Sequence, residues 1–279
     1  MLPFPQLVQY GNTVVYNYDD INPNNMTGTV TTLGTNSNFG SYGTRMCSYR
    51  EQIYAVTQTS QVFKVEPSTN TFTQIATRPV SVRNIGFTTN GSYLYLAGGY
   101  SSTNRFDRYN LNTSTWDTLA NLPSAMYDIS ICIDYDNNDF IYLQKNNVFY
   151  KYDIANNTWI TTGLATLPFS SGSSAEGGWI YSSGYIYYSY GTNFARYDIK
   201  NNVWVTLSSS TMGTRNKISR MGNYIYGVSA TNGLWQYQLS TDTWSKINAS
   251  TPSGTGEIAI ACSYNHAYAI SGSTLYRID

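Results

Sequence analysis

The chain has 279 residues and a formal net charge of zero, and only 11% of its residues are charged. A neutral chain without a Lys/Arg run lacks the positive surface that nucleic-acid binding requires, and no window approaches the roughly 18 unbroken apolar residues of a membrane span. Aromatic residues make up 15% of the chain, which is too many for a disordered protein. We therefore expect a folded protein with no nucleic-acid partner and no membrane insertion.

The first 34 residues contain three candidate strands, LVQYG, TVVYNYD and TGTVTTLG. The N-terminus lacks the basic region and the long apolar stretch of a signal peptide, so we expect none in this sequence. Further along, Cys47, Cys132 and Cys262 each lie in an apolar, strand-like run. We interpret them as small buried core residues, because they fit neither a zinc site nor a disulfide framework.

Five stretches in the middle of the chain each contain four short strands in succession. In one of them the runs are RNIGFTTN, SYLYLAGGY, RFDRYNLN and TWDTLANLP, which are rich in β-formers and bounded by Gly, Asn or Pro. No window shows the 3.6-residue period of a helix. A further segment, 256–279, contributes three more strands. The five complete stretches are 45–78, 83–123, 127–168, 174–208 and 214–248.

A Tyr followed seven positions later by a Trp marks the last two strands of most stretches. The pairs are Tyr109 and Trp116, Tyr152 and Trp159, Tyr197 and Trp204, and Tyr237 and Trp244, with Val65 and Phe72 in the first stretch. With partial copies at Tyr18 and Ile278, the first member recurs every 40 to 47 residues. That period is typical of four-stranded propeller blades, and we assign the aromatic pairs to the core between blades.

The repeat resembles the kelch motif, in which a double glycine after the second strand precedes a Tyr and a Trp at fixed separation. Gly98 and Gly99 form the one intact doublet, which elsewhere decays to SYG, YGVS and ISGS. The resemblance covers nearly the whole chain and implies a kelch-repeat β-propeller. It leaves the function open, because kelch propellers serve as binding modules, scaffolds and occasionally enzymes.

We therefore expect an all-β fold in which residues 1–279 form a single β-propeller of four-stranded antiparallel blades. Counting the repeat anchors favours seven blades, whereas counting residues per blade allows six, with an extra N-terminal hairpin. In both cases strands from 1–34 and 256–279 complete the terminal blades and close the ring. Such closure removes the open sheet edge at which chains aggregate.

Six charged residues, one per repeat unit, lie just before or within the predicted innermost strands. They are Arg45, Arg83, Asp128, Glu176, Arg215 and Glu257. In a propeller these positions converge near one mouth of the central channel, so they form our candidate ligand-binding site. The resemblance implies two uses: Arg reads acidic partners in kelch adaptors, and Arg with Glu handles a sialic acid in a kelch mutarotase. The alternative is that these residues pair with one another.

Catalytic and metal-binding patterns are scarce in the sequence. Kelch-like copper oxidases need two His ligands, and the single residue His266 excludes that chemistry. Asp134, Asp136 and Asn138 place oxygen ligands at alternate positions, as a calcium loop does, but the glycine and the distal glutamate of such a loop are missing. We interpret this segment as a hairpin turn, and we predict no catalytic residue, no metal and no cofactor.

The loops are rich in Tyr, Asn, Ser and Gly, which suits a recognition surface because Tyr provides contact area with few rotatable bonds. We therefore expect a non-enzymatic binding or scaffold propeller that recognises a protein or a glycan through loops on one face. The scarcity of Lys and Glu favours an extracellular protein or a structural component of a virus particle or another assembly over a cytoplasmic protein. Two alternatives stay open: a sugar-acting enzyme resembling the mutarotase, and an intracellular kelch adaptor.

Overall fold

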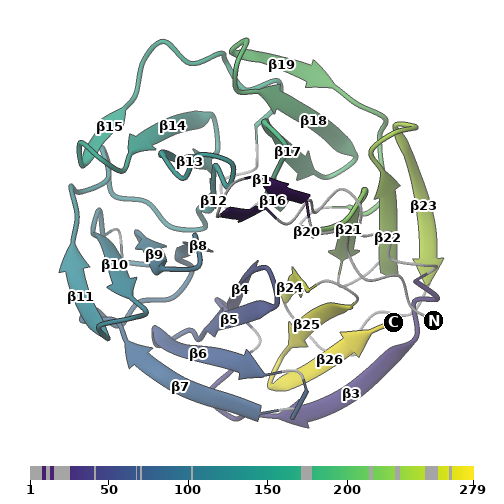
Figure 1. The fold of residues 1–279 in the computed structure, drawn as a ribbon, viewed down its shortest axis with the longest axis horizontal. Helices are drawn as coiled ribbons and strands as arrows, with labels where there is room; N and C mark the ends of the chain where they lie inside the picture. The colour runs from purple at the N-terminus through teal and green to yellow at the C-terminus, as the bar shows by residue number, and fades with distance from the viewer. Residues whose placement is uncertain are drawn as a thin grey trace.

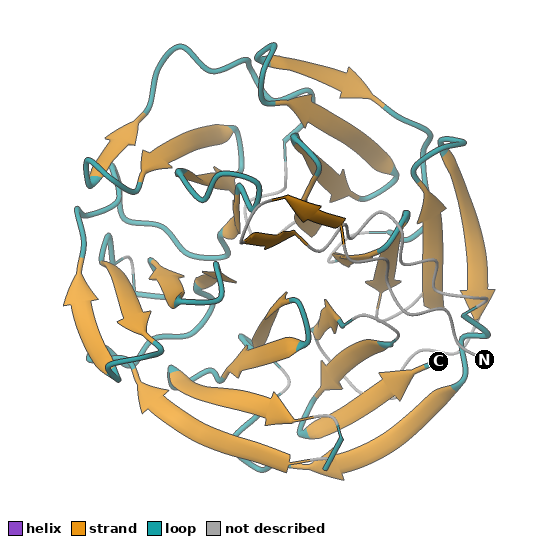
Figure 2. Ribbon diagram, in the orientation of Figure 1, coloured by secondary structure: helices purple, strands orange, loops and turns teal. Residues whose placement is uncertain are grey.

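The computed structural model describes residues 8–10, 13–15, 26–40, 42–66, 68–69, 71–101, 103–170, 178–213, 216–229, 233–248, 257–263 and 266–279. The regular secondary structure of these residues is β-strand (Figure 2). They contain no helix of the length and apolar character needed to cross a membrane.

The strands form antiparallel sheets that we number as blades in chain order, each running from the channel to the rim. Blade 1 contains β4 (Arg45–Tyr49), β5 (Gln52–Val56), β6 (Gln61–Glu66) and β7 (Thr71–Thr77). Blade 2 contains β8 (Gly86–Thr89), β9 (Tyr93–Ala97), β10 (Phe106–Asn110) and β11 (Thr115–Thr118). Blade 3 contains β12 (Ser130–Ile133), β13 (Phe140–Lys145), β14 (Val148–Asp153) and β15 (Thr158–Ile160).

The other three blades follow the same order, but the last one takes its outermost strand from the N-terminal segment. Blade 4 contains β16 (Gly178–Ser182), β17 (Tyr185–Tyr190), β18 (Asn193–Asp198) and β19 (Val203–Thr206). Blade 5 contains β20 (Lys217–Met221), β21 (Tyr224–Ser229), β22 (Gly233–Gln238) and β23 (Thr243–Asn248). Blade 6 contains β24 (Ile258–Cys262), β25 (Ala267–Ser271), β26 (Thr274–Ile278) and β3 (Val30–Thr35).

The blades form a closed ring, in which each innermost strand packs against the innermost strands of both neighbours and the last strand of each blade lies on the rim (Figure 1). The predicted all-β propeller is therefore confirmed. The described residues form six four-stranded sheets, so the favoured count of seven blades is wrong. The hairpin of β1 (Val8–Tyr10) and β2 (Thr13–Val15) belongs to no blade, as the six-blade alternative expected.

The anchor count failed because it treated both ends of the chain as separate blades. Ile278 belongs to β26, and the missing fourth strand of its blade is β3 from the other end of the chain. Tyr18, the other terminal anchor, lies outside the described residues. The seam continues beyond the paired strands, since the backbone N–H of Gly28 donates to the carbonyl oxygen of Asp279 at 2.7 Å. The predicted pairing of N- and C-terminal strands thus closes the ring.

Aromatic side chains fill the space between neighbouring blades. In blade 3, Tyr152 and Trp159 face one another across β14 and β15, and Phe106 from blade 2 packs edge-on against Tyr152 with ring centroids 4.9 Å apart. The same arrangement recurs twice, with Phe149 against the Tyr–Trp pair of blade 4 and Phe194 against that of blade 5. Such edge-to-face contacts contribute about 0.5–1.5 kcal/mol each beyond the burial of their area.

A second repeated contact, which we call the rim clip, joins each of these blades to the preceding one. In blade 4 the side-chain oxygen of Asn202 accepts hydrogen bonds from the Tyr197 hydroxyl at 2.7 Å and from the Ala165 backbone N–H at 2.8 Å. Burial raises the pKa of Tyr197 to about 12, so the hydroxyl remains a donor at neutral pH. Asn157 and Asp242 form the same clip in blades 3 and 5.

The residue at the centre of each rim clip has a left-handed backbone. The φ angles of Asn157, Asn202 and Asp242 are 53°, 52° and 52°, a conformation that Asn and Asp tolerate better than other side chains. The Asn or Asp in this turn therefore has two roles: it allows the tight turn between the third and fourth strands, and its side chain supplies the acceptor that joins the blade to the preceding one. In blade 2 the equivalent residue is Ser114, and Tyr109 donates instead to the backbone carbonyl of Ile75.

The three cysteines have no disulfide partner. Cys132 and Cys262 are buried, whereas Cys47 is only half-buried, so the prediction of three buried core residues holds for two of them. Burial raises the pKa of the Cys262 thiol to about 12, which keeps it uncharged and unreactive at neutral pH.

Candidate functional site

The strand order gives the two ends of the channel different surfaces. We call the end at which the innermost strands begin the loop face. It carries the linkers between blades, such as 78–85 and 119–129, and the connections between second and third strands, such as 98–105. The opposite end carries the short turns that follow the innermost strands, such as 50–51 and 183–184. Longer connections therefore gather on the loop face.

Three of the six predicted mouth residues meet on the loop face. Arg45 at the start of β4 forms an ion pair with Glu257 of blade 6, with Nη1 and Oε2 2.8 Å apart. Its other terminal nitrogen lies 3.8 Å from a carboxylate oxygen of Asp128 in blade 3. All three side chains are largely buried. Residues from three separate blades thus converge as the topology predicted.

The charges of this cluster strongly affect one another. Burial alone would raise the pKa of Glu257, but the positive charges of Arg45 and Lys217 outweigh that cost and hold the pKa at about 2. Burial lowers the pKa of Lys145; the charge of Asp128 opposes this shift, and those of Lys217 and Arg45 reinforce it. Within the described residues, the mouth therefore combines three cations with two carboxylates.

Arg83 is the one other predicted mouth residue whose position the structure describes. Glu176 and Arg215 lie outside the described residues. Arg83 is exposed, and its guanidinium stacks on the ring of Tyr100, 4.3 Å from the centroid. The prediction overlooked Lys145 and Lys217, although Lys217 begins an innermost strand and could have been found by the same positional rule.

The channel behind the mouth is narrow. Side chains from all six innermost strands enclose a space of about 70 Å³, among them Phe87, Ile131, Trp179 and Ile260. Pockets for small organic ligands typically have roughly 300–1,000 Å³.

The residues considered for metal binding are engaged in a turn. Asp134 is buried, and one of its carboxylate oxygens accepts a hydrogen bond from the backbone N–H of Asp136 at 3.1 Å. The other oxygen accepts one from the side chain of Asn137, and Asn138 has a φ of 59°. No cluster of three or more metal-ligating side chains is found within the described part of the chain. His266 contacts the Asp279 carboxylate beside the seam of blade 6.

Aromatic and cationic side chains also gather on the loop face outside the mouth. Tyr42 and Tyr100, with exposed fractions of 51% and 45%, are the two aromatic residues among the four exposed large hydrophobic residues that the structure describes. Tyr100 packs edge-on against Tyr127 with centroids 5.4 Å apart, and Lys145 lies over the Tyr127 ring. Together with Arg83, these residues form a surface over blades 1 to 3 that we call the tyrosine patch.

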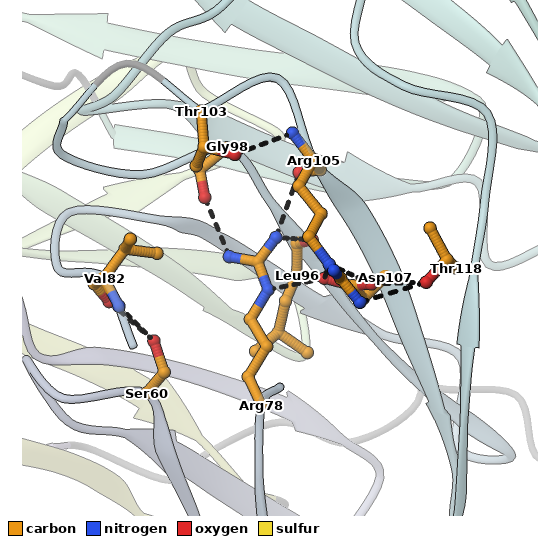
Figure 3. A network of polar contacts seen from close by, with 9 residues as sticks. All are labelled: Ser60, Arg78, Val82, Leu96, Gly98, Thr103, Arg105, Asp107 and Thr118. Atoms are coloured by element: carbon orange, nitrogen blue, oxygen red, sulfur yellow. Dashed lines mark hydrogen bonds and ion pairs between the residues drawn. The ribbon is translucent and has the colours of Figure 1, made fainter. Parts of the chain in front are cut away.

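A buried ion pair, Arg78 with Asp107, lies at the base of the 98–105 connection that carries Tyr100 (Figure 3). Arg78, in the linker after β7, has only 2% of its surface exposed, and its Nε donates to a carboxylate oxygen of Asp107 at 2.7 Å. Arg105 donates to the same carboxylate at 2.8 Å. Sequence reasoning missed Arg78 and Asp107. One sequence signal was available for Arg78: it precedes a proline in its linker, and the residue before the proline of the next linker is the buried Leu122.

Comparison with known proteins gives one positive result. The family model of the Kelch motif matches residues 82–123, which contain all four strands of blade 2 and the glycine doublet. A search of curated proteins found no match to this sequence. The matched motif lies within a ring of four-stranded blades, and its Tyr–Trp pairing recurs in blades 3, 4 and 5. The chain is thus a six-bladed β-propeller with a kelch motif in blade 2, and the match and the fold together support a kelch-repeat propeller.

Proposed function

We propose that this chain is a non-enzymatic binding propeller that recognises a protein partner through the tyrosine patch on its loop face. Kelch propellers in general serve as protein-binding or scaffold domains, and the proposal specifies the surface used here. The observation that carries it is the pair Tyr42 and Tyr100, which present large exposed rings on one face. Rigid aromatic side chains of this kind provide contact area at low entropic cost.

The state of the mouth charges favours binding over catalysis. A sugar-acting enzyme needs Arg and Glu side chains that can reach one substrate, because general acid–base groups act within hydrogen-bond distance. Arg45 and Glu257 instead contact each other, and the channel behind them encloses about 70 Å³. Both features support a structural use of the mouth, in which the ion pair joins blade 6 to blade 1.

The exposed cation of the patch indicates which partners it suits. Arg83 is held on Tyr100 by a cation–π contact, and no carboxylate pairs with it within the described residues. A guanidinium fixed in this way presents its N–H groups outward and recognises carboxylates well. We expect a protein surface in which an acidic residue lies beside apolar ones.

Site-specific photo-crosslinking in the cells or particles that contain the protein tests the proposal. A photoreactive residue replaces Tyr42 or Tyr100 on the loop face, and Asn112 on the rim or Asn223 on the opposite face serves as control. We expect discrete protein adducts from the two loop-face positions and none from the controls. Adducts from the control positions alone, or none from any position, would contradict the proposal. A glycan array with the full chain covers the other partner class: a hit lost in Tyr100→Ser would replace the protein partner by a sugar.

A further inference from the structure

Arg78 breaks the pattern of the repeat. The linkers that follow blades 2 and 4 each bury an apolar side chain between blades, Leu122 and Met212. The linker after blade 1 has an arginine in the place of Leu122, and its guanidinium is fully buried. Asp107 is equally buried, and the corresponding residues two positions before the Tyr anchors of blades 3 and 4 are Tyr150 and Ala195. At the junction between blades 1 and 2, both partners of the buried pair therefore differ from the residues at the corresponding positions of these other blades.

The donors of Arg78 converge on the base of one loop. Nη1 donates to the carbonyl oxygen of Gly98 at 2.8 Å, and Nη2 donates to that of Arg105 at 3.0 Å. These two residues are the first and last of the 98–105 connection, and Gly98 also donates its N–H to the Arg105 carbonyl. The side chain from blade 1 therefore fastens both ends of a loop of blade 2 (Figure 3).

This loop is then fixed by its neighbours on either side. The N–H of Gly99 donates to the carbonyl oxygen of Met126 at 3.0 Å, and the N–H of Tyr100 donates to that of Arg83 at 2.7 Å. The close approach requires glycine, because a Cβ at Gly98 would lie 2.3 Å from the Met126 oxygen. Gly98 and Gly99 also have φ angles of 59° and 139°. The backbone that carries Tyr100 thus contacts both linkers beside it.

The 98–105 connection differs from its counterparts in the other blades. The second and third strands are joined by 57–60 in blade 1, by 146–147 in blade 3 and by 191–192 in blade 4. Among the corresponding connections that the structure describes, only that of blade 2 brings an exposed ring, Tyr100, into the tyrosine patch. A longer loop has more conformations to lose on binding, and that loss weakens affinity unless the loop is ordered beforehand.

We propose that Arg78 and Asp107 are positioning residues for recognition: they hold the 98–105 loop in one conformation, so that Tyr100 meets the partner preorganised. The role in recognition rests on the proposed function, whereas the ordering of the loop can be tested without a partner. The ion pair is unnecessary for joining the blades, since Leu122 and Met212 occupy their linkers as apolar side chains.

Hydrogen exchange on the full chain tests the positioning step without any partner. The variant Arg78→Leu/Asp107→Leu removes both fully buried charges together. Arg105 loses its carboxylate partner, but its side chain is partly exposed and keeps its hydrogen bond to Thr118. We expect exchange at the Gly98, Gly99 and Tyr100 amides to rise by about tenfold or more, while the other blades and the melting temperature stay near wild type. The matched control is Arg108→Gln/Asp117→Asn, which removes an Arg–Asp pair from the rim of the same blade.

Unchanged exchange at the three loop amides in the Arg78/Asp107 variant, with its fold intact, would overturn the inference. A global rise in exchange throughout the ring would also overturn it, because it would show a purely structural role. Affinity for the partner found by crosslinking is the second measurement, with an expected loss of about tenfold in this variant and none in the rim control. Faster loop exchange in the variant without a loss of affinity would show that the ion pair orders the loop but that recognition does not depend on this order. Failure to find any partner would contradict the proposed function and leave the exchange result standing.

Discussion

The rim and the mouth of this propeller are held together by different chemistry. On the rim, blades 3, 4 and 5 use the same clip of a Tyr hydroxyl, a left-handed Asn or Asp and a backbone N–H. Around the mouth and under the tyrosine patch, ion pairs differ from junction to junction, with Arg45 and Glu257 at one and Arg78 and Asp107 at another. The repeated contacts build the ring, and the individual ones mark the face on which this chain differs from a generic propeller.

The largest expected effect comes from breaking the buried pair on one side only. Arg78→Leu leaves the Asp107 carboxylate buried with Arg105 as its remaining charged neighbour, and such half-pairs cost about 3–5 kcal/mol of unfolding free energy. Arg78→Leu/Asp107→Leu should recover most of that loss, because the uncompensated charge is gone. Urea denaturation measures both variants. Equal destabilisation of the single and double variants would show that packing rather than charge holds this junction.

Acid should weaken the mouth. The pKa of Glu257 in the folded protein, about 2, lies below its ordinary value of 4.5. Its contribution to stability is therefore complete above about pH 5 and is lost as the pH falls toward 2, on the order of 3 kcal/mol in total. Glu257→Gln should be less stable at pH 7 and show a flatter acid limb in urea titrations at several pH values. If the unfolding free energy of the variant falls with pH as steeply as that of the wild type, the acid sensitivity comes from other carboxylates.

A rim clip should respond more weakly. Tyr197→Phe removes one hydrogen bond, while Asn202 keeps the Ala165 N–H, so we expect a loss of about 1 kcal/mol. Tyr152→Phe tests the same contact in the next clip, with the same expectation. Thermal unfolding of both variants, compared with the wild type, measures the difference. Losses as large as that of Arg78→Leu would remove the proposed distinction between rim and mouth.

The smallest effect is expected for an ion pair on the rim itself. Arg108 and Asp117 are 2.9 Å apart, close to the 2.7 Å of Arg78 and Asp107, but their side chains are 28% and 48% exposed. Water screens such a pair, so Arg108→Gln/Asp117→Asn should change the unfolding free energy by less than about 1 kcal/mol. Urea denaturation at low and high salt checks this. The contrast between two pairs of equal geometry isolates the effect of burial.

Local spacing predicted the ring well, because each blade repeats the same contacts. The Tyr and Trp seven residues apart are direct cross-strand partners, as between Tyr109 and Trp116, and a Phe three residues before the Tyr could have been added to the motif at Phe106, Phe149 and Phe194. The blade count could not be settled in the same way. β3 has no repeat signature, and its partner strand lies at the other end of the chain.

The mouth was only partly predictable because its contacts join residues far apart in the sequence. Arg45 and Glu257 are 212 positions apart, and position relative to the strands suggested that they converge without showing that they pair. The sequence signal at Arg78 was weak: an arginine before a proline in a linker is typical of an exposed turn, and only the comparison with Leu122 in the next linker indicates otherwise. Only the burial of Asp107, 29 positions later, gives that arginine its role.

The strand exchange in blade 6 also has a consequence for how the protein is made. Thr27 and Asp279, which meet at the seam, are 252 positions apart, so β3 leaves the ribosome long before β26. Blades 1 to 5 can form during synthesis from strands that are neighbours in the chain, whereas β3 must wait as an unpaired strand until β26 has been made. Unpaired strands of this kind are prone to wrong partners. Newly made chains should therefore be most vulnerable to aggregation in the interval before β26 emerges, and loss of β26 should leave the ring open even though five blades are complete.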